Sequence, residues 1–171
     1  MVVCYLDYDG CLHHGKVRRG PRRTAVMDEP GHVLMEWATD LERALKPHPE
    51  VKLVLSTSWV HALGFDRAKS YLPTALQARV VGATFHRREH GPTRELRRLW
   101  AEGGRGAQIA WDVSRRKPRK WFAVDDAVDE FLPGQLQNLV RCESSVGLSE
   151  PRAQRDLSAM LESLREPTSS T

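Results

Sequence analysis

The chain has 171 residues, of which 40% are hydrophobic and 28% are charged, and its formal net charge is +4. This composition excludes a disordered or fibrous protein and fits a single globular domain. The basic balance permits a polyanionic partner without requiring one.

Apolar runs and helical spacing alternate along the chain. The apolar runs predict strands over residues 2–6, 51–55, 79–83, 121–124 and 139–142. Between them, the helical spacing predicts helices over residues 33–45, 61–72, 93–100 and 108–113. A last helix is capped by Ser149 and runs to Leu164. Strands that are apolar throughout and alternate with helices favour a mainly parallel sheet covered on both faces. We therefore expect an α/β, Rossmann-like three-layer sandwich of about five strands with no large cap domain. Residues 1–166 are expected to form this one domain and 167–171 a disordered tail.

The cysteines and the absence of long apolar stretches bear on location. Cys4, Cys11 and Cys142 are odd in number and lack metal-type spacing, which favours buried free thiols in a reducing compartment. No apolar stretch reaches about 18 residues, and the first residues lead directly into a strand, so we expect neither a membrane span nor a signal peptide. A cytoplasmic location is the resulting expectation.

Two segments are rich in basic residues. The first covers residues 16–23 and the second covers residues 115–120. Each is equally compatible with a solvated surface segment and with a polyanion contact. Because the first segment follows Asp9 closely, it could also fold over a neighbouring site as a small basic flap.

Acidic and hydroxyl residues stand where the predicted strands end. Asp7 and Asp9 follow the first strand, Ser56 follows the second, and Asp125 and Asp126 follow the strand over 121–124. The carboxyl ends of parallel strands meet at one edge of a sheet, where ligands bind in such folds. Close carboxylates repel and persist where a cation or a proton compensates them.

These are the residue types that phosphoryl transfer needs. Mg²⁺ prefers carboxylate oxygens and neutralises phosphoryl charge. A carboxylate can attack phosphorus, and a second can transfer the proton. Hydroxyl groups and a basic side chain can hold the phosphoryl oxygens.

Three stretches carry a resemblance to a known family. The order Asp7-Tyr8-Asp9-Gly10, then Leu55-Ser56-Thr57-Ser58-Trp59, then Asp125-Asp126 resembles the haloacid dehalogenase (HAD) superfamily. The Ser-Thr-Ser-Trp stretch and Gly147-Leu148-Ser149 before the last helix are most similar to the small HAD domains of Swiss Army Knife RNA-repair proteins. The resemblance covers nearly the whole chain.

The resemblance implies roles for the acidic residues. Asp7 would be the nucleophile and a metal ligand, and Asp9 the general acid/base with its backbone carbonyl on the metal. Asp125 would ligate Mg²⁺ directly, and Asp126 would ligate or support it. Asp129 would be an outer-shell partner.

The resemblance also implies a phosphoryl-binding group. Ser56 would bind the phosphoryl oxygens, with Thr57, Gly10 and Arg105 as further substrate-binding residues. Arg105 takes the place of the family's usual lysine, because Lys117 and Lys120 lie too close to the strand over 121–124. An arginine keeps the charge and can donate two hydrogen bonds to phosphate. With Arg105, the expected catalytic residues are Asp7, Asp9, Ser56 and Arg105.

Other interpretations exist for several of these residues. Asp-x-Asp-Gly alone is often only a turn. His13 and His14 are interpreted as loop histidines, because no third nitrogen or sulfur ligand has suitable spacing. Trp59 could stack on a base but is more often core, as are the other four tryptophans. A phospho-acceptor receiver domain would place its acidic pair first, whereas here the Asp-x-Asp motif comes first.

The expected function is a Mg²⁺-dependent phosphohydrolase that works through an aspartyl-phosphate. An open, capless site suits a large phosphorylated substrate such as the end of an RNA or DNA strand under repair. The alternative is a non-catalytic module that binds a phosphorylated ligand or nucleic acid with a degenerate HAD site.

Overall fold

Five apolar segments pair into one sheet in the computed structural model of the chain, which describes residues 1–164. The strands are β1 (Val2–Leu6), β4 (Val51–Leu55), β5 (Val80–Ala83), β6 (Lys120–Asp125) and β7 (Leu139–Arg141), in the order β5-β4-β1-β6-β7. Every neighbouring pair is parallel. All five residues of the central strand β1 are buried, as expected for a strand covered on both faces.

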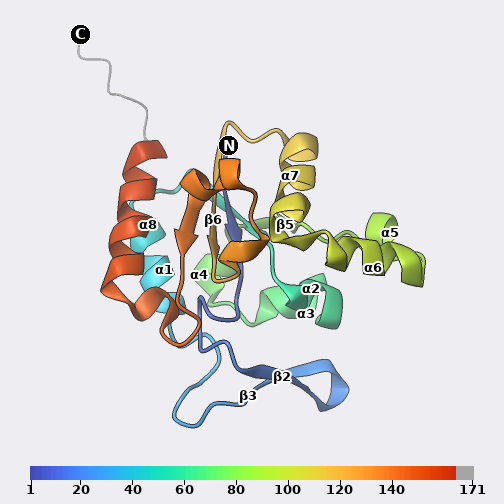
Figure 1. The fold of residues 1–171 in the computed structure, drawn as a ribbon. Coiled ribbons are helices and arrows are strands. Elements are labelled where there is room, and N and C mark those ends of the chain that lie inside the picture. The colour runs from blue at the N-terminus through green and yellow to red at the C-terminus, as the bar shows by residue number, and fades with distance from the viewer. Residues whose placement is uncertain (165–171) are drawn as a thin grey trace.

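Helices cover both faces of this sheet (Figure 1). The helices of residues 1–164 are α1 (Ala38–Leu45), α2 (Ser58–Leu63), α3 (Phe65–Ser70), α4 (Thr74–Gln77), α5 (Arg87–His90), α6 (Arg94–Glu102), α7 (Gly104–Arg116) and α8 (Pro151–Leu164). Short 3₁₀ turns η1 (Pro21–Arg23), η2 (Val128–Glu130), η3 (Pro133–Asn138) and η4 (Gly147–Ser149) lie between them. The predicted three-layer α/β sandwich is confirmed.

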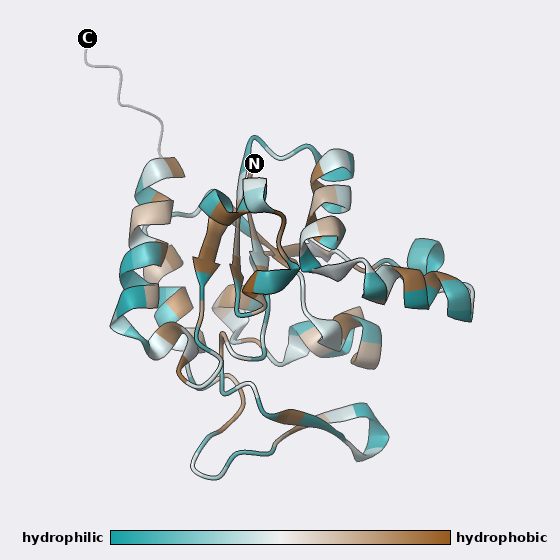
Figure 2. Ribbon diagram, in the orientation of Figure 1, coloured by the Kyte–Doolittle hydropathy of each residue, from teal (hydrophilic) through white to brown (hydrophobic). Residues whose placement is uncertain are grey.

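The alternation of side chains along β1 creates two cores. Cys4 and Leu6 face the larger core, which α1 and α8 cover, whereas Val3 and Tyr5 face a smaller core against α7. Successive side chains of a strand point to opposite faces, so a short apolar run contributes to both layers. Figure 2 shows the hydrophobic residues gathered in the strands and the hydrophilic ones on the outer faces.

Four predicted helices differ from the observed ones. The helix predicted over 33–45 begins only at Ala38, and the one over 61–72 is two helices separated at Gly64, whose φ of 97° no helix accommodates. The helix predicted over 108–113 begins at Gly104 and therefore includes Arg105. At the last helix, Ser149 ends a 3₁₀ turn, and Pro151 starts α8, a position that suits its fixed φ.

The first basic segment forms part of a hairpin. Strands β2 (Val17–Gly20) and β3 (Thr24–Met27) pair antiparallel and extend beyond the carboxyl edge of the main sheet (Figure 1). The sequence pattern concealed the hairpin because none of its strand residues is fully buried, so neither short strand shows the apolar alternation of a strand with one buried face. Residues 1–164 contain no separate cap domain, as predicted.

The second basic segment has a structural role in the smaller core. Asp112 on α7 is fully buried, and it accepts hydrogen bonds from the Tyr5 hydroxyl at 2.9 Å and from Arg116 Nε at 2.8 Å. Arg115 Nη2 donates to the same carboxylate at 3.2 Å. Burial opposes ionisation of Asp112, but these donors outweigh it and lower the pKa of the carboxyl group below its usual value.

The tryptophans divide between core and periphery. Trp37 and Trp59 are buried, whereas Trp100, Trp111 and Trp121 are only partly buried, so the core prediction is correct for two of the five. Trp100 lies on α6, which with α5 extends away from the sheet (Figure 1). There it stacks on His90, with ring centroids 3.7 Å apart.

Three further predictions concern membrane spans, cysteines and the C-terminal residues. Among residues 1–164, no helix has the length and apolar character that crossing a bilayer requires. All three cysteines are buried free thiols, as predicted. The disordered tail predicted for residues 167–171 lies outside the described residues.

Gly147 tests the packing between the larger core and the turn before α8. Its φ is +45°, and a Cβ there would overlap the Trp37 ring and the Cys11 carbonyl oxygen. We expect Gly147→Ala to lower the free energy of unfolding by about 3 kcal/mol, from backbone strain plus overpacking. Urea denaturation of the purified protein measures this.

Alanine substitutions at two other glycines separate the effect of backbone strain from that of overpacking. Gly64 has a positive φ but open space around it, so we expect Gly64→Ala to lower the free energy of unfolding by about 1 kcal/mol, from backbone strain alone. Gly134→Ala has neither problem and should change stability by less than about 0.5 kcal/mol. Equal losses at Gly147 and Gly64 would contradict the overlap.

Candidate active site

The strand register brings three site residues together. Leu6 of β1 is level with Leu55 of β4 and with Val124 of β6. The next residue on each strand is therefore Asp7, Ser56 or Asp125, and these lie side by side at the carboxyl edge. Backbone bonds continue the ladder to this level, from Asp7 N–H to the Val124 carbonyl and from Ser56 N–H to the Leu6 carbonyl. Sheet pairing alone thus assembles the carboxylates and the hydroxyl.

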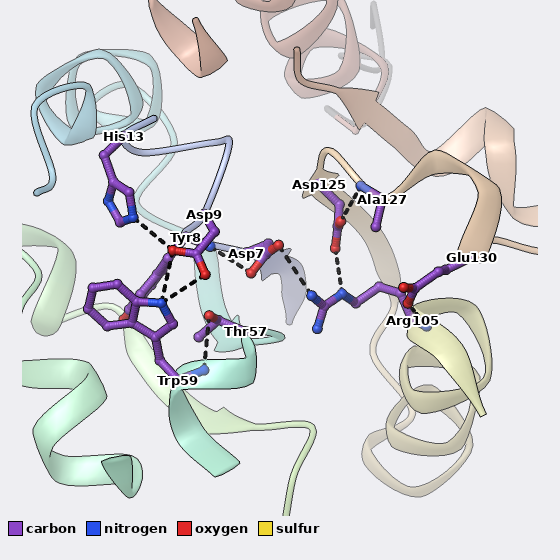
Figure 3. Close-up of polar contacts among 10 residues, drawn as sticks. All are labelled: Asp7, Tyr8, Asp9, His13, Thr57, Trp59, Arg105, Asp125, Ala127 and Glu130. Atoms are coloured by element: carbon purple, nitrogen blue, oxygen red, sulfur yellow. Dashed lines mark hydrogen bonds and ion pairs between the residues drawn. The ribbon is translucent and has the colours of Figure 1, made fainter. Parts of the chain in front are cut away.

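Asp7 lies at the centre of the site and is 4% exposed. Its Oδ1 accepts the Tyr8 N–H at 2.8 Å, and its Oδ2 pairs with Arg105 Nη2 at 3.2 Å (Figure 3). Burial raises the pKa of Asp7 well above its usual value, and the nearby Asp125 and Asp9 carboxylates add to the rise. Arg105 opposes that shift.

Asp125 and Asp126 complete an acidic group with Asp7. One carboxylate oxygen of each residue lies within 4.8 Å of the others. Asp125 is 1% exposed, and burial raises its pKa to about 6 against the opposing charge of Arg105. Asp126 is half-buried, and burial raises its pKa too, although a hydrogen bond from Ser144 opposes the rise.

Arg105 links two of these carboxylates from the first turn of α7. Its Nη2 contacts Asp7 Oδ2 at 3.2 Å and its Nε contacts Asp125 Oδ2 at 2.9 Å (Figure 3). The backbone N–H of Arg105 donates to Glu130 Oε2 at 2.9 Å, which anchors the start of α7 beside the site. Lys117 ends α7 in a left-handed conformation, and Lys120 Nζ donates to carbonyls at the end of α8, so neither lies at the site.

Asp9 is held apart from the acidic group by two side chains. Trp59 Nε1 donates to both Asp9 carboxylate oxygens, each at 3.0 Å. His13 is fully buried, and its Nδ1 accepts the Met35 N–H, so the ring proton lies on Nε2 and donates to Asp9 Oδ1 at 2.9 Å. Figure 3 shows both rings directed at the same carboxylate.

The second motif supplies one free hydroxyl and one helix cap. Ser56 is 1% exposed, and its Oγ has no hydrogen-bond partner among the described residues. Thr57 caps α2, because its Oγ1 accepts the Trp59 N–H at 3.3 Å. Of these two neighbouring hydroxyls, that of Ser56 is therefore the one left to bind a ligand.

Gly10 is required by the approach of an acidic neighbour. Its φ is +74°, and a Cβ at this position would overlap the carboxylate of Asp126. A side chain here would therefore both strain the turn and displace Asp126.

Sequence reasoning missed three positioning residues. His13 was interpreted as a loop histidine and Trp59 as core, yet both orient Asp9; Trp59 is also buried, as predicted. Glu130 is exposed, and its carboxylate accepts the backbone N–H of Arg105. Asp129, the expected outer-shell partner, is an exposed residue of η2. Only proximity in the fold reveals these roles.

The residues present fit a hard divalent cation. Asp125 Oδ2 lies close to Arg105 but has no hydrogen bond in residues 1–164, so it keeps a free acceptor beside the oxygens of Asp7 and Asp126. Three carboxylates with all-oxygen donors are what Mg²⁺ prefers. Burial raises the pKa values of all three carboxyl groups, which indicates that this amount of negative charge needs a positive partner.

A parallel α/β sheet with acidic residues following its first and fourth strands in chain order, and a hydroxyl following the second, defines a HAD-superfamily domain. Residues 3–153 match the family described as "HAD domain in Swiss Army Knife RNA repair proteins". The chain therefore belongs to this family, as the motifs predicted. No curated protein and no solved structure matches the chain.

The raised pKa of Asp125 predicts a pH-dependent stability in the presence of chelator. The folded protein binds this proton more tightly than the unfolded chain does, so the contribution is present below about pH 4 and is lost as the pH rises through about 6. Asp125→Asn cannot titrate, so its free energy of unfolding should fall less over this interval, by roughly 2–3 kcal/mol. Urea denaturation between pH 4 and 7 measures the difference.

Asp156→Asn on α8 is the matched control, because its carboxylate is about half exposed and forms only a surface ion pair. It should follow the wild-type curve. Parallel curves for wild type and Asp125→Asn would show that burial does not strain this carboxylate.

Proposed function

We propose that the chain is a Mg²⁺-dependent phosphohydrolase that acts on the end phosphates of nucleic acids. The observation that carries this proposal is the buried group of Asp7, Asp125 and Asp126 beside the free Ser56 hydroxyl. Membership of a family of RNA-repair HAD domains supports a nucleic-acid substrate. Three buried free thiols support a reducing, cytoplasmic location.

The geometry supports a two-step reaction. In the first step, an Asp7 carboxylate oxygen attacks phosphorus, the bond from phosphorus to the leaving oxygen breaks, and Asp9 donates its proton to that oxygen. In the second step, Asp9 accepts a proton from water, the water oxygen attacks phosphorus, and the bond to Asp7 breaks. Free carboxylate and inorganic phosphate result.

Each remaining residue has a task in this scheme. Trp59 and His13 fix the orientation of the Asp9 carboxylate, so that the proton is transferred from a defined position. The Ser56 hydroxyl would donate to a phosphoryl oxygen, and Arg105 would pair with another. When bound by Asp7, Asp125, Asp126 and the Asp9 backbone carbonyl, Mg²⁺ would neutralise phosphoryl charge and orient the group for attack.

A second candidate is a binding module without turnover. Arg105 already places a positive charge between Asp7 and Asp125, at 3.2 and 2.9 Å, where the superfamily normally carries a lysine. This arrangement would compensate the carboxylates without a metal. Phosphate release from an aryl phosphate and from 5′- or 3′-phosphorylated oligoribonucleotides, each with Mg²⁺ and with chelator, separates the candidates. Binding without release in every condition would favour the module.

The nucleophile assignment leads to a specific variant. Asp7→Asn keeps the size of the side chain but removes the attacking carboxylate, so we expect Mg²⁺-dependent turnover to fall at least about 10³-fold. Circular dichroism would confirm that the fold is intact. Asp156→Asn makes the same chemical change on the surface of α8 and should retain wild-type turnover. Unreduced activity of Asp7→Asn would rule out an aspartyl-phosphate on this residue.

A further inference from the structure

A groove of about 790 Å³ lies between the β2–β3 hairpin, helices α2 and α3, and the α5–α6 segment. Figure 1 shows the hairpin beside α2 and α3, with α5 and α6 on the same side of the molecule. The groove is lined by five arginines and by a single carboxylate, that of Asp66; the arginines are Arg19, Arg23, Arg67, Arg87 and Arg97. It is therefore a strongly positive surface outside the acidic site.

The charges of these arginines are not compensated. None of the five guanidinium groups forms an ion pair with a carboxylate of residues 1–164. Three of them instead donate to neutral backbone carbonyls: Arg97 donates to Gly91, Arg19 to Ala62 and Arg67 to Arg22. The bonds of Arg19 and Arg67 join the hairpin to α2 and α3, and all three leave the full positive charge in the groove. In contrast, Arg18 of the same hairpin pairs with Asp28.

The hairpin tip carries arginine where the backbone disfavours it. Arg22 and Arg23 have φ values of 54° and 57°, a left-handed conformation in which glycine, asparagine or aspartate is less strained. Retaining charged side chains in this conformation is consistent with a role for the charge itself.

The groove adjoins a second hollow that reaches Asp9. A smaller hollow of about 120 Å³ is lined by Asp9 and Trp59, and it shares Arg19, Ala62 and Leu63 with the larger groove. A chain lying in the groove would therefore have one end beside the general acid/base.

The groove also offers aromatic surface. Phe85 and His61 both line it, and their ring centroids lie 5.0 Å apart. A positive groove with aromatic side chains suits an unpaired nucleic-acid strand, because guanidinium groups pair with successive phosphates and the rings stack on bases. An acidic peptide would use the charge but not the rings.

We propose that this groove binds the sugar-phosphate backbone of a single-stranded polynucleotide whose terminal phosphate enters the active site. The proposal rests on the proposed function for the fate of that terminal phosphate, and it assigns substrate selection to the hairpin, α2–α3 and α5–α6. The groove would hold the nucleotides next to the end, and the acidic site would act on the end itself.

The test uses the full chain and a 5′-phosphorylated, 3′-fluorescein-labelled oligoribonucleotide of about ten nucleotides in chelator, with fluorescence anisotropy as the readout. The variant Arg23→Gln/Arg87→Gln removes the charge of two guanidinium groups. Neither group has a hydrogen-bond or ion-pair partner among the described residues, so the fold should be intact. We expect Kd to rise about 10-fold and the slope of log K against log salt to fall in magnitude by about 1.4. The lysine version, Arg23→Lys/Arg87→Lys, should largely retain binding.

The control Arg43→Gln/Arg152→Gln makes the same change in net charge on α1 and α8, where both arginines form exposed ion pairs. It should bind nearly as wild type does. An equal loss in this control, wild-type binding by Arg23→Gln/Arg87→Gln, or competition by an acidic peptide as effective as that by unlabelled oligonucleotide would each overturn the proposal.

A second readout separates the groove from the chemistry. Hydrolysis of a small aryl phosphate depends on the acidic site alone, so it should be unchanged in Arg23→Gln/Arg87→Gln. A protein that hydrolyses nothing but loses oligonucleotide binding in this variant would refute the proposed function and support the groove. A variant that loses aryl-phosphate hydrolysis and oligonucleotide binding together would overturn the separate role of the groove.

Discussion

The ion-pair bridge from Arg105 to Asp7 and Asp125 is the interaction on which the site depends. The register of β1, β4 and β6 places the buried carboxylates of Asp7 and Asp125 next to each other, and neither is exposed to enough water to screen its charge. A single guanidinium reaches both, through Nη2 and through Nε. Its position is set by the start of α7, which the Glu130 carboxylate holds through the Arg105 N–H. The bridge therefore connects the two halves of the sheet's carboxyl edge.

The same charge balance explains why the site suits phosphate. The ionised form of a buried carboxylate is unfavourable unless a cation lies beside it. Phosphoryl oxygens also carry negative charge, so they too require a cation and hydrogen-bond donors in a buried site. Asp9 is treated differently from its neighbours, since Trp59 and His13 both donate to it. The two carboxylates of the first motif therefore have different surroundings: Asp7 lies beside Arg105, and Asp9 lies beside the ring N–H groups of Trp59 and His13.

Arginines of equal charge have unequal roles because their partners differ. Arg115 and Arg116 are bound to Asp112 and stabilise the smaller core, although the sequence permitted a polyanion contact for them. The arginines of the groove lack carboxylate partners in the described chain and remain available to an anion. A run of basic residues in the sequence predicts positive charge at the surface. Only the positions of the acidic residues in the fold decide which of these charges lack an ion-pair partner.

The sequence by itself determined the parallel α/β sheet, the family, and the presence of acidic groups at strand ends. These follow from local patterns: apolar runs long enough to be strands, and Asp and Ser directly after them. Only the tertiary structure decided that Arg105 lies within α7 and bridges Asp7 and Asp125, that His13 and Trp59 hold Asp9, and that residues 17–27 form a hairpin. Those features depend on contacts between residues far apart in the chain, or on short strands with no buried face, and neither leaves a periodic pattern in the sequence.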